Sequence, residues 1–424
     1  MLTRRDSLRL LAGAVVGAAA LPARPAAAAN RVWTVTGQSS SSLQPFDDKL
    51  KSYMQARNIP YGSLAVLRQG KLVLARGYNW TTDTFQAQPT SLFRLASLSK
   101  PVTATAIMKL VQDGRLSLSA KVAPMLGLST AADSRLGEVT VLNLLQHRGG
   151  WKVWTPETPD ALPDPMFSDF DIARTLGLPL PVTQADIMDY TSRRTLDFYP
   201  GSEFAYSNYG YLVLGKVIEK VTGLPYATYV QQSVLSPMKI TRMVQGRTAQ
   251  SLRRSSEVPY YSQYSGTTVL YNTDPTTPPV PAPYGVFNLE NMAAHGAWLS
   301  TAVDMAKFTT IFDAPGLLTS PSLDAMFAPP SNYNQTDPSW YGMGWSVRPV
   351  NGSRSTWHNG SIAGTTTLMV RRWDGLSWVV LFDQRDDPSG LEYDNEIDNL
   401  MHQAADSVGP DSWPSTNLFP SYGL

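Results

Sequence analysis

The chain has 424 residues, of which 43% are hydrophobic and 16% charged, enough core-forming material for one large domain or two cooperating ones. Its formal net charge of +1 gives no electrostatic case for a nucleic-acid partner or an acidic membrane surface. Cysteine is absent and histidine occurs four times, which excludes disulfides and cysteine nucleophiles and argues against zinc sites, so we expect no metal and no cofactor.

Residues 1–29 form a segment of their own. Arg4 and Arg5 precede an apolar run that is too short to span a membrane, and small residues suited to cleavage follow it up to Ala29. This order predicts a signal peptide, and the arginine pair favours the twin-arginine route. A Sec-type signal and a retained anchor are the alternatives. We therefore expect an exported protein, periplasmic or secreted, without a stable membrane span after signal removal.

The next elements predict a helix, a hairpin and a second helix. Residues 45–58 place apolar side chains on one helical face, and two short apolar runs then flank Gln69-Gly70. Residues 97–112 read as a helix that Gly114 closes in a left-handed conformation.

The middle of the chain is mixed and its last third returns to strands. Helical patterns occupy 116–150 and 205–245, and a Pro-, Thr- and Tyr-rich stretch covers 250–290, either bordering a site or as a tolerated insertion. Asn351-Gly352 and Asp374-Gly375 each lie between two apolar runs, which predicts two hairpins, and "NEIDNLMHQAAD" predicts a terminal helix.

Strands near both ends with helices between them predict an α+β fold. We expect an antiparallel sheet flanked by N- and C-terminal helices, with a mostly helical inserted domain. The predicted boundaries are 30–120 and 290–424 for the sheet domain and 121–289 for the helical domain with long loops.

Two Ser-x-x-Lys sequences occur, and their contexts differ. Ser97 stands where a helix begins, so Lys100 lies one turn further along and both side chains can face one direction. The helix N-terminus adds partial positive charge and free N–H groups near the serine. Ser236 is followed by proline, with Lys239 after it, which is typical of a loop.

Two further motifs follow in the chain. Tyr206 and Asn208 form a Tyr-x-Asn sequence after a Pro-Gly turn and before an amphipathic helix. His358, Asn359 and Gly360 form a His-x-Gly sequence, which we expect to precede a strand against whose edge a substrate backbone could lie. For the other three histidines, His147, His295 and His402, a structural role is the expectation.

Ser-x-x-Lys, Tyr-x-Asn and His-x-Gly in this order resemble the penicillin-recognising serine hydrolases. The Tyr-x-Asn form is most similar to the group that holds class C β-lactamases, D-Ala-D-Ala carboxypeptidases, D-aminopeptidases and family VIII esterases. Segments such as "PGSEFAYSNYGY" and "YGMGW" also look familial, and together the similarities cover most of residues 45–385. The resemblance implies a β-lactamase/transpeptidase-like fold.

The resemblance also implies roles for the motif residues. Ser97 would be the nucleophile, Asn208 would orient Lys100 and the acyl side of the substrate, and the backbone N–H groups of Ser97 and Ser361 would form an oxyanion hole. His358 would line the leaving-group edge, with Asn359 and Gly360 contacting substrate. His358 and Asn359 depart from the Lys-Thr-Gly of class C β-lactamases, which weakens any carboxylate-binding role there.

The proton acceptor for the serine is Lys100 or Tyr206. A lysine needs burial to lower its pKa, whereas a tyrosine needs nearby positive charge. Because His358 replaces a permanent cation, the balance favours neutral Lys100 as the first base, with Tyr206 relaying the proton to the leaving group. The sequence leaves this choice open.

The expected function is an exported serine hydrolase that acts through an acyl-enzyme on a small ester, an amide or a peptide. A class C-like β-lactamase and a D,D-carboxypeptidase are the enzymatic alternatives. A non-catalytic binding protein with a retained fold is the alternative of another class, which the intact set of motif residues disfavours.

Overall fold

The computed structural model describes residues 31–424, except residues 157, 313–315, 335, 386 and 388–393. The predicted signal peptide, residues 1–29, lies outside the described residues. Within the described part of the chain, no helix has the length and apolar character needed to cross a membrane.

The centre of the fold is an antiparallel sheet of eight strands in the order β1-β3-β2-β13-β12-β11-β10-β9. The strands of this sheet are β1 Val32–Gln38, β2 Tyr61–Arg68, β3 Lys71–Thr81, β9 Trp340–Tyr341, β10 Ser346–Val350, β11 Ser353–Ile362, β12 Thr365–Arg371 and β13 Leu376–Phe382. The short strands outside it are β4 Phe93–Arg94, β5 Val244–Gln245, β6 Ser265–Gly266, β7 Val280–Pro281 and β8 Trp298–Ser300.

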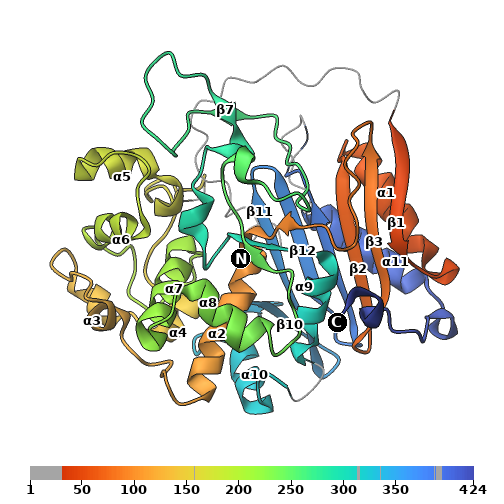
Figure 1. Ribbon diagram of the computed structural model, residues 1–424. Helices are drawn as coiled ribbons and strands as arrows, with labels where there is room; N and C mark the ends of the chain where they lie inside the picture. Colours follow the sequence, from red (N-terminus) through yellow and green to blue (C-terminus); the bar gives the residue numbers. More distant parts are fainter. Residues whose placement is uncertain (1–30, 157, 313–315, 335, 386, 388–393) are drawn as a thin grey trace.

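Eleven α-helices lie within the described residues. Their bounds are α1 Gln44–Ala56, α2 Ser99–Gln112, α3 Val122–Leu126, α4 Val141–Leu145, α5 Asp169–Leu176, α6 Gln184–Ser192, α7 Asn208–Thr222, α8 Tyr226–Val230, α9 Ala302–Phe308, α10 Ser320–Phe327 and α11 Asp394–Ser407. Figure 1 shows α1 and α11 beside the sheet on one side of the molecule and α3 to α8 gathered on the other.

Both faces of the central strands are covered, which explains their continuous apolar sequences. In β2, Leu64 and Val66 join a core cluster with α1 and α11, whereas Ala65 and Leu67 join the core on the opposite face. On that opposite face α9 packs on β2 and β13. The sheet therefore separates an outer layer of terminal helices from the larger helical body.

The predicted α+β class and the antiparallel sheet are confirmed. The hairpins at Gln69-Gly70, Asn351-Gly352 and Asp374-Gly375 are confirmed as the connections β2–β3, β10–β11 and β12–β13. Residues 121–289 contribute α3 to α8, followed after Val230 by a π-helical turn, Gln231–Leu235, and then by short strands and 3₁₀ turns. The division into a sheet domain and an inserted domain stays a prediction.

Two local predictions were wrong. The helix expected over 97–112 is divided, because a 3₁₀ turn, Ala96–Leu98, carries Ser97 and the α-helix begins at Ser99. The His-x-Gly sequence was expected before a strand, but His358 lies inside β11. The strand begins earlier because the Asn351-Gly352 turn starts the ladder with β10 at Ser353.

Candidate active site

Ser97 lies in a tight turn between a short strand and a helix. Ala96 just before it has φ of 48°, a left-handed conformation that costs a non-glycine residue on the order of 1–3 kcal/mol. Ala96 is fully buried and Ser97 is only 5% exposed, so the surrounding core fixes this strained turn. The turn places Ser97 just before α2, with its hydroxyl beside the Lys100 side chain.

Lys100, the second residue of α2, is fully buried, and its side-chain nitrogen meets three oxygen atoms. Its Nζ lies 2.9 Å from Ser97 Oγ, 2.7 Å from Asn208 Oδ1 and 3.3 Å from the His295 carbonyl oxygen. Burial lowers the pKa of Lys100 well below its usual value, and the Asp164 carboxylate offsets part of this effect.

The three contacts decide how a neutral Lys100 is arranged. An uncharged amine has two N–H groups and one lone pair. The Asn208 and His295 oxygens are carbonyl-type acceptors and can only accept, so they take the two N–H groups. The lone pair is then left for the hydroxyl of Ser97, the one contact that can donate. The geometry therefore suits removal of the Ser97 proton by Lys100.

Asn208 begins α7, and a buried carboxylate fixes the orientation of its amide. Asn208 Nδ2 donates to Asp164 Oδ2 at 2.7 Å, while the backbone N–H of Met166 donates to Asp164 Oδ1 at 2.9 Å. Because the amide nitrogen faces Asp164, the amide oxygen must face Lys100. Burial raises the pKa of Asp164, and the hydrogen bonds from Met166 and Asn208 oppose this. Asp164 was not predicted from the sequence.

Tyr206 has a buried hydroxyl that faces Ser97 and makes no hydrogen bond of regular geometry to any described residue. Burial raises the pKa of Tyr206 far above 10, and the nearby Ser97 side chain lowers it by less. A phenolate is therefore strongly disfavoured. Tyr206 can carry a proton to a leaving group, but it is a poor first base in the free protein.

His358 uses both ring nitrogens within the protein. Its Nδ1 lies 2.6 Å from the backbone oxygen of Asn359, which can only accept, so Nδ1 carries the hydrogen. Nε2 then accepts from the Tyr341 hydroxyl at 2.9 Å. Burial lowers the pKa of His358 to about 3, and the positive charge of Lys100 acts in the same direction. The imidazole is thus neutral and fixed in one tautomer.

The backbone of β11 approaches the Ser97 turn closely at Gly360. A Cβ added to Gly360 would lie 2.4 Å from the carbonyl oxygen of Leu95 and 3.0 Å from the backbone nitrogen of Ser97. Thr367, paired with Gly360 across the ladder, donates its hydroxyl to that same carbonyl at 2.8 Å. Ser361 follows directly, so the two backbone N–H groups predicted for an oxyanion hole lie on adjoining segments.

Asn359 was predicted to contact substrate, but the strand turns its side chain away from the site. Residues alternate along β11, so Asn359 lies on the opposite face from His358 and Gly360. Its cross-strand partner Leu368 belongs to the core beneath α1 and α11. Only the backbone of Asn359 can contribute to the site, and its carbonyl oxygen already accepts from His358.

Two histidines for which a structural role was expected lie beside the motif residues. His147 packs its ring against Tyr206 at a centroid distance of 4.1 Å and accepts a hydrogen bond from the backbone N–H of Ser207 on Nδ1. His295 supplies the carbonyl that meets Lys100. Burial lowers the pKa of both imidazoles well below the usual value. His402 lies apart from the site, with its ring edge-on to Trp378.

The structure thus brings together Ser97, Lys100, Tyr206, Asn208 and His358, with Gly360 and Ser361 at the adjoining strand. Ser236, the serine of the second Ser-x-x-Lys sequence, lies in the turn after Leu235, where its carbonyl accepts from the backbone of Lys239. Among the described residues, no cluster of three or more His, Cys, Asp or Glu side chains could hold a metal ion.

Comparison with known proteins gives a consistent result. A family model described as Beta-lactamase matches residues 46–402. The chain is 29% identical over 345 residues to "Penicillin-binding protein 4*" of Bacillus subtilis (strain 168), covering 78% of this chain and 68% of that protein. It is also 29% identical over 208 residues to "Protein flp" of Staphylococcus aureus (strain MRSA252), covering 48% of this chain and only 38% of that protein.

A solved structure shares the fold. The crystal structure of the D-amino acid amidase from Ochrobactrum anthropi SV3 complexed with L-phenylalanine amide matches with a TM-score of 0.65 and 23% identity. The match covers 87% of this chain and 99% of that chain.

Proposed function

Because the chain belongs to the β-lactamase family and is a serine hydrolase, we propose that it cleaves amide or ester bonds through an acyl-enzyme on Ser97. The observation that carries the proposal is the contact of 2.9 Å between Lys100 Nζ and Ser97 Oγ in a buried setting that disfavours the lysine charge. A buried lysine and a strained serine turn both cost folding free energy, so a protein that had lost catalysis would not be expected to retain them in contact.

The first step transfers the Ser97 proton to neutral Lys100 as Oγ attacks the substrate carbonyl carbon. The carbonyl oxygen becomes an oxyanion, which accepts hydrogen bonds from the backbone N–H groups of Ser97 and Ser361. The bond to the leaving nitrogen or oxygen then breaks as that atom takes a proton from Tyr206, which Lys100 reprotonates. Lys100 then takes a proton from a water molecule that attacks the acyl carbon, and it returns this proton to Ser97 Oγ as the acyl–Oγ bond breaks, which releases the acid and free Ser97.

The neutral His358 supports a substrate whose leaving side carries no carboxylate. The residue is held by Tyr341 and Asn359, so it offers neither a positive charge nor an unused N–H group to an anion. We therefore place small amides first, including D-amino-acid amides of the kind named for the Ochrobactrum structure, together with short-chain esters. A β-lactamase or D,D-carboxypeptidase activity is the second candidate, favoured by the relation to Penicillin-binding protein 4*.

Export belongs to the same proposal. The basic, apolar and small-residue order of residues 1–29 supports delivery outside the cytoplasm by the twin-arginine route. A fusion of these residues to a reporter should be exported, and replacement of Arg4 and Arg5 by lysine should block it.

The activity is tested by comparing kcat/KM of the mature chain for D-phenylalanine amide, p-nitrophenyl butyrate and nitrocefin. We expect turnover of the first two, no efficient turnover of nitrocefin, and loss of all activity in Ser97→Ala. Efficient nitrocefin hydrolysis would favour the β-lactamase alternative. Binding of these compounds without turnover, and without covalent labelling of Ser97, would favour a non-catalytic binding protein.

A further inference from the structure

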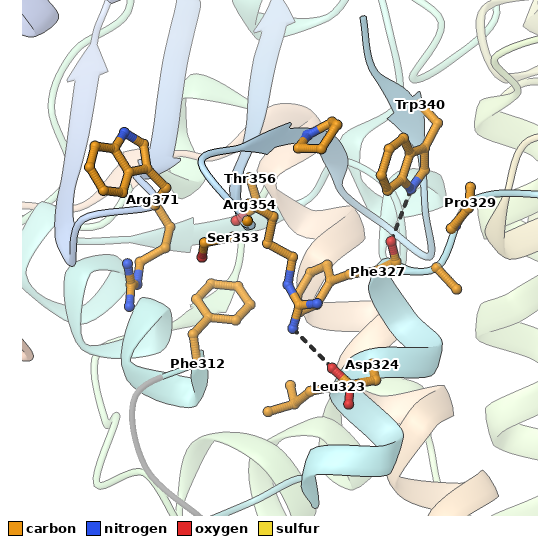
Figure 2. A pocket seen from close by; sticks show the side chains of 14 residues that line it. Phe312, Leu323, Asp324, Phe327, Pro329, Trp340, Ser353, Arg354, Thr356 and Arg371 are labelled. Atoms are coloured by element: carbon orange, nitrogen blue, oxygen red, sulfur yellow. Dashed lines mark hydrogen bonds and ion pairs between the residues drawn. The ribbon is translucent and has the colours of Figure 1, made fainter. Parts of the chain in front are cut away.

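A cavity of about 500 Å³ lies between α10 and the β9–β12 end of the sheet (Figure 2). Phe312 and Phe327 line it from the helical side and Trp340 from β9, while Arg354 and Arg371 enter it from β11 and β12. This volume is within the range of small-molecule sites, which combine an apolar lining with a few placed polar groups.

On the side of the sheet, the cavity wall consists of residues that lie directly opposite one another on four neighbouring strands. Trp340 of β9 is paired with Val347 of β10, Val347 with Thr356 of β11, and Thr356 with Arg371 of β12. Directly opposed residues point to the same face of a sheet, so an indole ring, a hydroxyl and a guanidinium group line one rigid surface. The Trp340 indole nitrogen donates to the Phe327 carbonyl at 2.9 Å, which fixes the ring.

The charges of the cavity favour an anion. Its lining residues include two guanidinium groups, of Arg354 and Arg371, and one carboxylate, of Asp324. Arg354 stacks 4.7 Å over the Phe327 ring, which holds the guanidinium while its in-plane N–H groups can donate. Its ion pair with Asp324 is long at 3.3 Å, and both side chains are well exposed, so this pair is weak and open to exchange.

Thr356 gives a second, independent indication that the cavity suits a polar ligand. Its side chain lines the cavity, the residue is 2% exposed, and its hydroxyl has no hydrogen-bond partner among the described residues. A buried hydroxyl without a partner is unfavourable, and a ligand oxygen beside Arg354 would provide one.

The cavity is separate from the catalytic site. None of its lining residues is Ser97, Lys100, Tyr206, Asn208 or His358. Along β11, Thr356 precedes Ser361 by five residues, which corresponds to about 16 Å of strand. A compound that fills the cavity therefore does not also reach the predicted oxyanion hole.

We propose that this cavity is a second binding site, for a small compound that has one carboxylate and an aromatic or branched apolar body. The carboxylate lies between the Arg354 guanidinium and the Thr356 hydroxyl, and the apolar body lies against Phe312, Phe327 and Trp340. This site goes beyond the proposed hydrolysis and does not depend on it.

The test is calorimetric titration of the mature chain with 3-phenylpropanoate, compared with 3-phenylpropan-1-ol, which has the same body without the charge. We expect saturable binding of the carboxylate with a Kd on the order of a millimolar or below and no measurable binding of the alcohol. Arg354→Gln should weaken binding about tenfold, because it removes the positive charge and the paired guanidinium donors, and the isosteric Thr356→Val several-fold, because it removes the hydroxyl donor.

Two controls separate this site from others. Arg174→Gln, at an exposed position of α5, removes one surface guanidinium and should leave the affinity unchanged. Covalent labelling of Ser97 by a fluorophosphonate should also leave it unchanged. Absence of binding, loss of binding after Ser97 labelling, or equal affinity in Arg354→Gln, Thr356→Val and the unmodified chain would each overturn the proposal.

Discussion

Replacement of Asp164 by asparagine tests whether a buried carboxylate positions the base through Asn208. The substitution keeps the size of the side chain and an oxygen that can accept from Asn208 Nδ2, but it removes the negative charge. The Asp164–Asn208–Lys100 series is linked by two contacts of 2.7 Å, so the change at Asp164 acts on Lys100 through one intervening amide.

The size of the effect follows from the hydrogen bond and the charge. A hydrogen bond to a charged group contributes about 1.5–3 kcal/mol and a neutral one about 0.5–1.5 kcal/mol, so the substitution weakens the hold on Asn208 by about 1–1.5 kcal/mol. A loss of 1.36 kcal/mol is tenfold in rate. We therefore expect kcat/KM of Asp164→Asn to fall about tenfold at its plateau.

The substitution should shift the pH profile of kcat/KM in a definite direction. The Asp164 carboxylate raises the pKa of Lys100, so its removal lowers that pKa further. Lys100 must be unprotonated to act as base, and kcat/KM of the free enzyme rises with pH through this pKa. The acidic limb of the profile in Asp164→Asn should therefore move to lower pH while the plateau falls.

Stability measurements separate positioning from damage to the fold. Burial raises the pKa of Asp164, so ionisation of this carboxyl costs folding free energy at neutral pH. An asparagine carries no such cost, but its single amide oxygen can accept from Asn208 Nδ2 or from the Met166 N–H and not from both. The two effects oppose each other, so Tm of Asp164→Asn at pH 7 should stay close to that of the unmodified chain. Asp169→Asn is the matched control, since Asp169 is buried nearby with a pKa raised to about 7 but makes no contact with Asn208 or Lys100.

The kinetic assay is kcat/KM for p-nitrophenyl butyrate from pH 5 to 9 on the unmodified chain, Asp164→Asn, Asp169→Asn, Asn208→Ala and the double variant Asp164→Asn/Asn208→Ala. In the double variant the loss should be close to that of Asn208→Ala alone, because Asp164 acts through that amide. An unmoved acidic limb with kcat/KM within about twofold of the unmodified chain would refute the positioning role.

Four further outcomes test the site. A fluorophosphonate probe followed by peptide mass spectrometry should label Ser97 alone, and label on Ser236 would contradict the assignment. Lys100→Ala and Tyr206→Phe should each reduce kcat by several orders of magnitude, and the double variant by little more, because the two groups act as a unit; additive losses would place one of them outside the site. His358→Lys should raise kcat/KM for nitrocefin relative to p-nitrophenyl butyrate, by a modest factor since desolvation of the buried lysine offsets most of the attraction to the carboxylate; an unchanged ratio would show that a cation there does not recognise carboxylates. Gly360→Ala should abolish acylation, measured as the rate of probe labelling, because its Cβ would lie 2.4 Å from the Leu95 carbonyl oxygen; normal labelling would mean that β11 can move away from Ser97 at little cost.

Local sequence patterns predicted much of the fold because they act over short distances. The turn dipeptides Gln69-Gly70, Asn351-Gly352 and Asp374-Gly375 identified three hairpins of the main sheet. The Ser97–Lys100 pair was predicted for the same reason, since the two residues are only three positions apart and the 3₁₀ turn that carries Ser97 leads directly into α2.

The site features that the sequence did not predict depend on contacts between segments that are distant in the chain. Asp164 lies 44 residues before Asn208, and in the sequence its Asp-Pro context indicates a turn, not a partner for an amide. The Tyr341–His358 contact joins β9 and β11, which are separated by β10 in the sheet, so it depends on how these strands assemble and is not visible in the local sequence. Neighbouring residues of a strand point to opposite faces, so the orientation of Asn359 away from the His358 side would have been predicted if the sequence had shown that β11 begins at Ser353.

The buried histidines around Lys100 couple the site to acid sensitivity of the whole fold. Burial lowers the pKa of His147, His295 and His358 in the folded chain, whereas in the unfolded chain each returns to about 6.5. Below pH 6.5 the unfolded state therefore binds up to three more protons than the folded state, and each proton removes about 1.36 kcal/mol of folding free energy per pH unit. Over the interval in which all three stay neutral in the fold, their combined contribution is a loss of about 4 kcal/mol per pH unit, which the raised pKa values of buried Asp164, Asp169 and Asp383 offset in part. The burial that keeps Lys100 uncharged thus also makes these three histidines a source of instability in acid.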